Sequence, residues 1–159
     1  MLSVHVNTRA PAFSRTYQEG GCTVAENKIL HPFSTVVHTH RLGEMVTLWR
    51  VRRDAQGGDH WTQVTRRSPA LPQSFVPVMK QDMMLLQGDR LALRCSLLNM
   101  SGREVRQGLA SYDEMCDVYI MYWVPGNHTN LLQGNTVCSN TGPPTSSLSS
   151  LGFNNIPVS

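Results

Sequence analysis

His38 and His40, separated by Thr39, have the residue type and spacing that begin a metal site. They close an extended run that starts at Phe33. In a β-strand the side chains at i and i+2 point to the same face, so both imidazoles are expected to project together. Such a pair supplies two ligands of a metal site, and the chemistry of a third ligand from elsewhere would help to select the metal. A pair of surface or hydrogen-bonded histidines is the alternative, and spacing alone leaves it open.

A candidate third ligand, Met115, precedes the segment 116–124, the strongest predicted strand of the sequence. Asp117 and Tyr119 share one face of that strand. Met115 joins this face if the extended run begins one residue earlier. A thioether favours Cu(I) over zinc or magnesium, so a His-His-Met set is typical of a copper centre. An ordinary core methionine is the alternative interpretation.

Short extended segments must position these residues, because no part of the sequence shows sustained helical periodicity. Turn residues separate the segments, a pattern typical of an antiparallel sandwich or jelly roll. Pro11, Gly20 and Gly21 are expected to interrupt the chain after a short first strand. The predicted strands cover residues 2–6, 33–40, 45–52, 60–65, 74–78, 90–97 and 116–124.

The 159 residues fit one domain, 1–159, and the tail at about 139–159 is expected to be loose or to wrap the surface. No stretch approaches the roughly 20 apolar residues that a membrane span needs. The net charge of +3 is spread over the sequence, whereas a nucleic-acid-binding protein would concentrate it on one face. Neither a membrane span nor a nucleic-acid partner is therefore expected.

Several features of the sequence indicate export. The four cysteines, an even number, allow three disulfide pairings, and the absence of a C-x-x-C pair argues against a zinc ribbon. Asn99 and Asn127 begin glycosylation sequons, although such short motifs also occur by chance. Residues 1–5 lack the basic start and apolar run of a signal peptide. An exported chain of this sequence would have lost its signal or be part of something longer.

Three segments, 38–43, 71–78 and 113–122, carry a resemblance to a known family. Their order and residues resemble the peptidylglycine α-hydroxylating (amidating) monooxygenases, a branch of the copper type II ascorbate-dependent monooxygenases. Dopamine β-monooxygenases share the first and third segments, whereas LPQ-F-PV and YIMY favour the peptidylglycine branch. The resemblance covers most of residues 22–138 and corresponds to the C-terminal catalytic copper domain of the family.

The resemblance implies a β-sandwich of jelly-roll type that is stapled by two disulfides, Cys22–Cys138 and Cys95–Cys116. It also implies one copper site in this chain, bound by His38, His40 and Met115. The second disulfide would hold the strand end that carries Met115. Tyr119 matches a tyrosine that binds the terminal carboxylate of the substrate.

The activity implied by the resemblance is hydroxylation of the Cα of a C-terminal glycine in glycine-extended peptides. Dioxygen is the oxidant and ascorbate the reductant, and the reaction is the first step of peptide amidation. The expected location is the secretory pathway, a secretory granule or the extracellular space. The family's N-terminal copper domain, which supplies the second electron, is absent from this chain and would be a missing partner.

Two positions depart from the family pattern. Val36 stands where the family has an arginine for the substrate carboxylate, and Asp117 stands where it has an asparagine. A valine cannot form the two parallel hydrogen bonds of an arginine with a carboxylate. These departures support an alternative function, a non-catalytic secreted sandwich that binds copper or a partner. A dopamine β-monooxygenase-like hydroxylase is a further alternative.

Overall fold

The computed structural model describes residues 1–126, 137–140, 153 and 157, and this part of the chain contains strands and turns but no helix. This described part of the chain therefore has no helix that could cross a membrane. The strands are β1 (Leu2–Val6), β2 (Arg9–Ala10), β3 (Ser14–Thr23), β4 (His31–His38), β5 (Gly43–Arg53), β6 (Asp59–Arg67), β7 (Val76–Pro77), β8 (Arg90–Asn99), β9 (Val105–Arg106), β10 (Asp117–Trp123) and β11 (Val137–Asn140).

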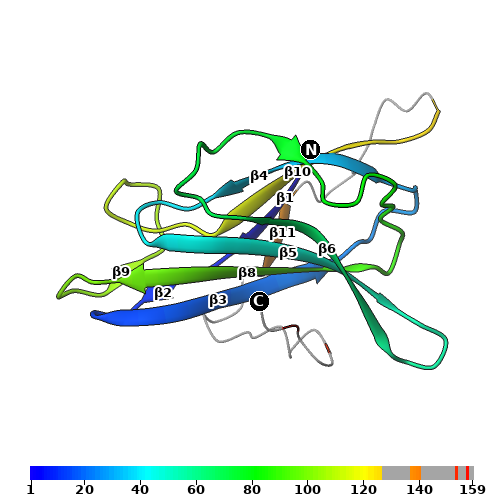
Figure 1. Ribbon diagram of the computed structural model, residues 1–159. Helices are drawn as coiled ribbons and strands as arrows, with labels where there is room; N and C mark the ends of the chain where they lie inside the picture. The colour runs from blue at the N-terminus through cyan, green and yellow to red at the C-terminus, as the bar shows by residue number, and fades with distance from the viewer. Residues whose placement is uncertain (127–136, 141–152, 154–156, 158–159) are drawn as a thin grey trace.

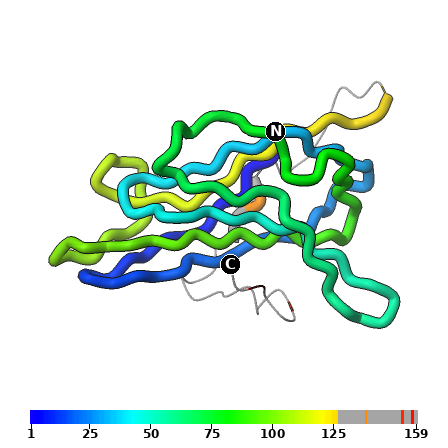
Figure 2. Tube along the Cα trace, viewed as in Figure 1, coloured from blue at the N-terminus to red at the C-terminus, as the bar shows by residue number. Residues whose placement is uncertain are grey.

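Two sheets form the layers of a sandwich (Figure 1). One sheet has the strand order β11-β1-β10-β4-β7, and the other has the order β3-β8-β5-β6. Strands β2 and β9 form a small separate pair. Figure 2 follows the same path and shows the first strand, in dark blue, beside β10 and β11. The described pairs are antiparallel except β1 with β11, so the predicted all-β sandwich is confirmed, while its jelly-roll type stays a prediction.

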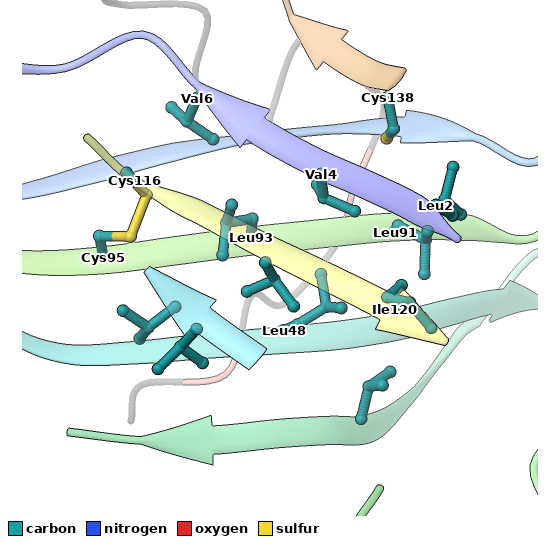
Figure 3. Packing of buried hydrophobic residues seen from close by; sticks show 14 of the residues in the cluster. Leu2, Val4, Val6, Leu48, Leu91, Leu93, Cys95, Cys116, Ile120 and Cys138 are labelled. Carbon is teal, nitrogen blue, oxygen red and sulfur yellow. A yellow bond between two sulfur atoms is a disulfide. The ribbon is translucent and has the colours of Figure 1, made fainter. Parts of the chain in front are cut away.

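The core lies between the two sheets and follows the alternation of the strands (Figure 3). Val118 and Ile120 of β10 are fully buried, and they face Leu91 and Leu93 of β8 across the core. Side chains at alternate positions of a strand share a face, so Asp117 and Tyr119 of β10 belong to the opposite, outer face. Burial of each leucine or isoleucine side chain stabilises the fold by about 1.5–3 kcal/mol. This burial fixes which face of each strand turns to the core, and the polar residues at alternate positions therefore face outward.

Both disulfides join one sheet to the other. Cys95 of β8 is bonded to Cys116, which directly precedes β10, and Cys22 of β3 is bonded to Cys138 of β11. This is the pairing that the resemblance implies. Figure 3 shows the Cys95–Cys116 bond crossing the core beside the start of β10. The two sheets are thus linked covalently at the point where the third candidate ligand enters.

The expected interruption at Gly20 and Gly21 is wrong, because both glycines lie inside the ten-residue strand β3. A Cβ atom on Gly21 would come within 1.8 Å of the Leu91 carbonyl oxygen. Glycine is therefore required there by the close approach of β8. Local propensity indicated a break, and pairing with β8 overrides it.

The expected tail at 139–159 lies mostly outside the described residues. Its Phe153 is 7% exposed and packs against Trp61 of β6, with ring centroids 5.2 Å apart. The Arg90 guanidinium lies 4.7 Å from the centroid of the Phe153 ring. At this position the chain therefore contacts the outer face of the four-stranded sheet.

Candidate metal centre

The first two candidate ligands lie where β4 ends. His38 is the last residue of β4, and His40 lies two residues beyond the strand, so the prediction that the strand carries both is wrong for His40. The two imidazole rings nevertheless lie close together, with centroids 5.3 Å apart and planes at 80°. Met115 lies two residues before β10, where Asp117 pairs with His38. The fold therefore brings both ligand-bearing segments to the same end of the five-stranded sheet.

Both histidines are held through the same ring nitrogen. His38 Nδ1 lies 2.6 Å from Gln73 Oε1, and His40 Nδ1 lies 3.0 Å from the Asp113 carbonyl oxygen. Both partners are acceptors, so each Nδ1 carries the ring proton and donates a hydrogen bond to its partner. The lone pair of a neutral imidazole then lies on Nε2, the nitrogen that remains for a metal. Hydrogen bonds of this kind orient histidine ligands in metal sites.

Gln73 is a positioning residue that sequence reasoning did not identify. Its amide nitrogen donates to the Thr39 carbonyl oxygen at 3.0 Å and to the Pro69 carbonyl oxygen at 3.3 Å. These two bonds fix which end of the amide is oxygen, and that oxygen faces His38. Gln73 is part of the LPQ segment that carries the family resemblance, and this motif was the available signal.

Glu114 joins the two ligand-bearing segments through three hydrogen bonds. Its Oε1 accepts the backbone N–H of His40 at 2.5 Å and that of Met115 at 2.8 Å. Its Oε2 accepts the backbone N–H of Leu42 at 2.8 Å. The side chain is fully buried, and a carboxylate in this position forms charge-assisted bonds that are roughly twice as strong as neutral ones. One oxygen atom therefore sets the separation between the His40 and Met115 backbones.

The backbone of Glu114 is also held on both sides. Its N–H donates to the Arg106 carbonyl oxygen at 3.0 Å. Its carbonyl oxygen accepts the Thr8 hydroxyl at 3.0 Å and the Gly108 N–H at 3.2 Å. With the Cys95–Cys116 bond two residues later, the segment that carries Met115 is fixed by hydrogen bonds and by a covalent link.

The available donors fit copper better than a harder metal. Two imidazole Nε2 atoms and the expected thioether would form a soft nitrogen–sulfur set, which suits Cu(I). In the described part of the chain, no three His, Cys, Asp or Glu side chains gather in a group that could hold a metal. The third donor expected from the sequence, the Met115 thioether, is not one of these residue types.

A polar row crosses the outer face of the sheet beside this centre. His5 of β1 pairs with Asp117 of β10, which pairs in turn with His38 of β4. His5 Nδ1 lies 2.8 Å from Asp117 Oδ1, and His5 Nε2 lies 3.0 Å from the amide nitrogen of Gln107. A neutral His5 that donates through Nδ1 and accepts at Nε2 satisfies both contacts. Asp117 is 1% exposed, and among the described residues its Oδ2 has no hydrogen-bond partner.

Tyr119 lies on the same outer face, opposite Val36. Burial is the largest cause that raises the pKa of Tyr119 above its usual value of about 10. The negative charge of Asp117 and hydrogen bonding with it raise the pKa further. At neutral pH the phenol is therefore protonated, and its single O–H is a neutral donor whose hydrogen bond Asp117 accepts.

Three adjacent strands of this sheet, β1, β10 and β4, contain no lysine or arginine. Their sequences are LSVHV in β1, HPFSTVVH in β4 and DVYIMYW in β10. Their ionisable groups other than Tyr119 and Tyr122 are the Asp117 carboxylate and the three histidines His5, His31 and His38. A negatively charged group placed here would meet Asp117 and would find no guanidinium or ammonium on these strands.

The structure also bears on the two expected glycosylation sites. The Asn99 side chain is fully buried, and its amide nitrogen donates to the carbonyl oxygens of Ala10, Pro11 and Arg103 at 2.8–2.9 Å. The folded domain does not expose this nitrogen, and glycosylation at Asn99 stays a prediction. Asn127 lies outside the described residues.

Comparison with known proteins identifies the family of this chain. The family described as "Copper type II ascorbate-dependent monooxygenase, C-terminal domain" matches residues 2–150. The peptidyl-glycine alpha-amidating monooxygenase B of Xenopus laevis is 35% identical over 145 residues, which are 90% of this chain and 15% of that protein. The mouse (Mus musculus) peptidyl-glycine alpha-amidating monooxygenase is 41% identical over 128 residues, which are 80% of this chain and 12% of that protein.

The Rattus norvegicus enzyme is 39% identical over 100 residues, which are 62% of this chain and 10% of that protein. The chain thus spans between about a tenth and a seventh of the length of the relatives it matches. The family match covers nearly the whole chain, and it includes both histidines, Gln73, Glu114 and Met115. The chain therefore belongs to the copper type II ascorbate-dependent monooxygenase family and corresponds to its C-terminal domain.

Proposed function

We propose that this chain is the oxygen-activating domain of a copper monooxygenase, with one copper bound by His38, His40 and Met115. Copper bound there would supply the redox chemistry with dioxygen, and ascorbate is the reductant of the complete enzyme. The protein's own part is to hold the ligands and to orient the substrate. The observation that carries this proposal is the shared Glu114 oxygen, which connects the His40 and Met115 segments.

The residues around the centre keep the ligands ready for metal. Gln73 and the Asp113 carbonyl hold the Nδ1 protons of His38 and His40, so the Nε2 lone pairs stay available. A neutral imidazole is the form that coordinates a metal. Since these contacts come from the protein itself, the two imidazoles need little reorientation when copper binds.

The proposed substrate is a glycine-extended peptide, and the proposed reaction is hydroxylation of the Cα of its C-terminal glycine. The related enzymes of Xenopus laevis and mouse are named for peptidylglycine amidation. Tyr119 would donate the hydrogen bond of its neutral phenol to the peptide's terminal carboxylate in place of Asp117. The complete enzyme would add a second copper domain. Two disulfides favour an oxidising compartment, so we place the protein in the secretory pathway.

Cu(I) bound to this chain is expected to have sulfur in its first coordination shell. The measurement is X-ray absorption at the copper edge of the reduced, copper-loaded chain. Met115→Ile should remove the sulfur signal and lower copper affinity, because isoleucine keeps the volume but has no donor atom. Met100→Ile is the matched control, since Met100 is 70% exposed and lies outside the site. A sulfur signal that persists in Met115→Ile would overturn the ligand assignment.

Activity requires a second copper domain in this proposal. Ascorbate-dependent hydroxylation of a glycine-extended peptide is expected when the chain is joined to the N-terminal copper domain of a related enzyme, and it should vanish in His38→Ala. Product formation can be followed by the 16 Da mass increase that one oxygen atom adds. His60→Ala is the control, because His60 is exposed and pairs with Asp54 away from the site.

A second candidate function is a non-catalytic domain that binds copper or a partner. The observation that favours it is the outer face beside the centre, which carries the Asp117 carboxylate and no lysine or arginine on β1, β4 or β10. Copper binding with a sulfur ligand but without hydroxylation in the joined enzyme would favour this function.

A further inference from the structure

A continuous series of side chains leads away from the candidate copper centre along the outer face of β10 and β4. Four cross-strand pairs make up this outer row: Asp117 with His38, Tyr119 with Val36, Met121 with Ser34, and Trp123 with His31. The register shifts between Met121 and Tyr122, where β4 contributes one extra residue. This irregularity lets Trp123 and His31 meet on the outer face, while Tyr122 packs against the core.

The outer row ends in an exposed aromatic platform. The rings of His31 and Trp123 are stacked, with centroids 4.0 Å apart and planes at 9°. Trp123 is 52% exposed, and the neighbouring Phe33 is 48% exposed. Stacking fixes the orientation of the indole, so its free face is prearranged for another flat or apolar side chain.

The chemistry of the outer row changes with distance from the copper centre. The end at His38 carries the polar side chains of Asp117 and Tyr119, and the Tyr119 phenol is the donor proposed for the substrate carboxylate. Beyond Tyr119 the row continues with the thioether of Met121 and the short side chain of Ser34, both half-buried. The far end is aromatic. With no lysine or arginine on either strand, the row favours an apolar peptide segment over an acidic one.

The length of the outer row matches an extended peptide. From Asp117 to Trp123 is six residues, so the two ends lie about 20 Å apart at roughly 3.3 Å per residue. A peptide that lies extended along the row covers the same distance with about six residues. A tripeptide reaches only about 10 Å and cannot contact Trp123.

We propose that the outer row binds the upstream part of the peptide substrate, and that Trp123, stacked on His31, binds an apolar or aromatic side chain about six residues before the reacting glycine. This inference rests on the proposed function for the position of the reacting residue. It makes Trp123 a specificity-determining residue of the site, although it lies far from the copper ligands. Selectivity of this kind distinguishes long peptides from short ones by binding.

The test compares three peptides by calorimetric titration of the copper-loaded chain. The first is an eight-residue glycine-extended peptide with phenylalanine six residues before the terminal glycine, the second has serine there, and the third is the C-terminal tripeptide. The phenylalanine peptide is expected to bind roughly threefold to tenfold more tightly than the serine peptide. Trp123→Ala should abolish this preference without changing tripeptide binding, and Trp123→Phe should restore most of it.

Leu109→Ala is the matched control, because Leu109 is 88% exposed and lies outside the outer row, and it should leave the preference unchanged. Equal binding of the two long peptides, equal weakening of all three by Trp123→Ala, or no binding at all would overturn the inference. Hydroxylation of the tripeptide by the joined enzyme tests the proposed function separately. If the tripeptide is hydroxylated but the phenylalanine peptide binds no more tightly than the serine peptide, the inference alone fails. If the phenylalanine peptide binds more tightly but the tripeptide is not hydroxylated, the proposed function alone fails.

Discussion

Replacing Glu114 with glutamine is expected to lower the free energy of unfolding by about 2–3 kcal/mol and to weaken Cu(I) binding roughly tenfold to a hundredfold. The carboxylate accepts three backbone N–H groups, from His40, Leu42 and Met115. A glutamine keeps the shape but presents an N–H₂ group where one of those oxygens lies. At least one buried donor then faces another donor and loses its partner. Urea unfolding gives the stability, and competition with a Cu(I) chelator gives the affinity.

Glu44→Gln provides the control for this experiment. Glu44 accepts a hydrogen bond from the Arg15 guanidinium at 2.8 Å and from the Ser96 hydroxyl at 3.0 Å, and its side chain is 33% exposed. Loss of a partly exposed ion pair costs at most about 1 kcal/mol, and copper affinity should not change. Equal effects of Glu114→Gln and Glu44→Gln would contradict the role given to Glu114.

Removal of each disulfide is expected to have a different consequence. The Cys22–Cys138 bond closes a loop of 116 residues. In the chain-entropy model, the Cys22→Ala/Cys138→Ala variant should lose about 5 kcal/mol of unfolding free energy. Cys95→Ala/Cys116→Ala opens a loop of 21 residues and should cost about 3 kcal/mol. Alanine leaves no thiol that could bind copper in place of Met115.

Copper affinity should respond in the opposite order. Cys116 directly follows Met115, so loss of the Cys95–Cys116 bond frees the segment that carries the thioether. The Cys22–Cys138 bond joins β3 to β11, away from both histidines. We expect weaker Cu(I) binding only in Cys95→Ala/Cys116→Ala, measured in the fully folded fraction. Unchanged affinity in that variant would show that Glu114 and its hydrogen bonds hold Met115 without the covalent link.

The strands were predictable wherever alternation of side chains decides burial. Strands β8 and β10 place Leu91, Leu93, Val118 and Ile120 in the core, as the alternating pattern predicts. The strand β3 was not predictable from local residues, because a glycine pair usually marks a turn. Only the close approach of β8 explains why Gly21 suits that strand.

The candidate ligands could be identified from residue type and motif, whereas the contacts that hold them could not. Gln73 lies 35 residues from His38, and Glu114 lies 74 residues from His40. The sequence does not show that the Glu114 carboxylate accepts backbone N–H groups from a distant turn. Such contacts depend on how the chain folds in three dimensions, and a single sequence does not contain that information in its spacing.

The Cys95–Cys116 bond also makes the assembly of the protein visible during oxidative folding. Its sulfur atoms come from β8 in one sheet and from the entry to β10 in the other, so they meet only after the two layers face each other. Trapping of free thiols during refolding therefore reports when the sandwich closes. The same event brings the segment that carries Met115 beside the end of β4. Thiol consumption at this pair would therefore report when the proposed copper site is assembled.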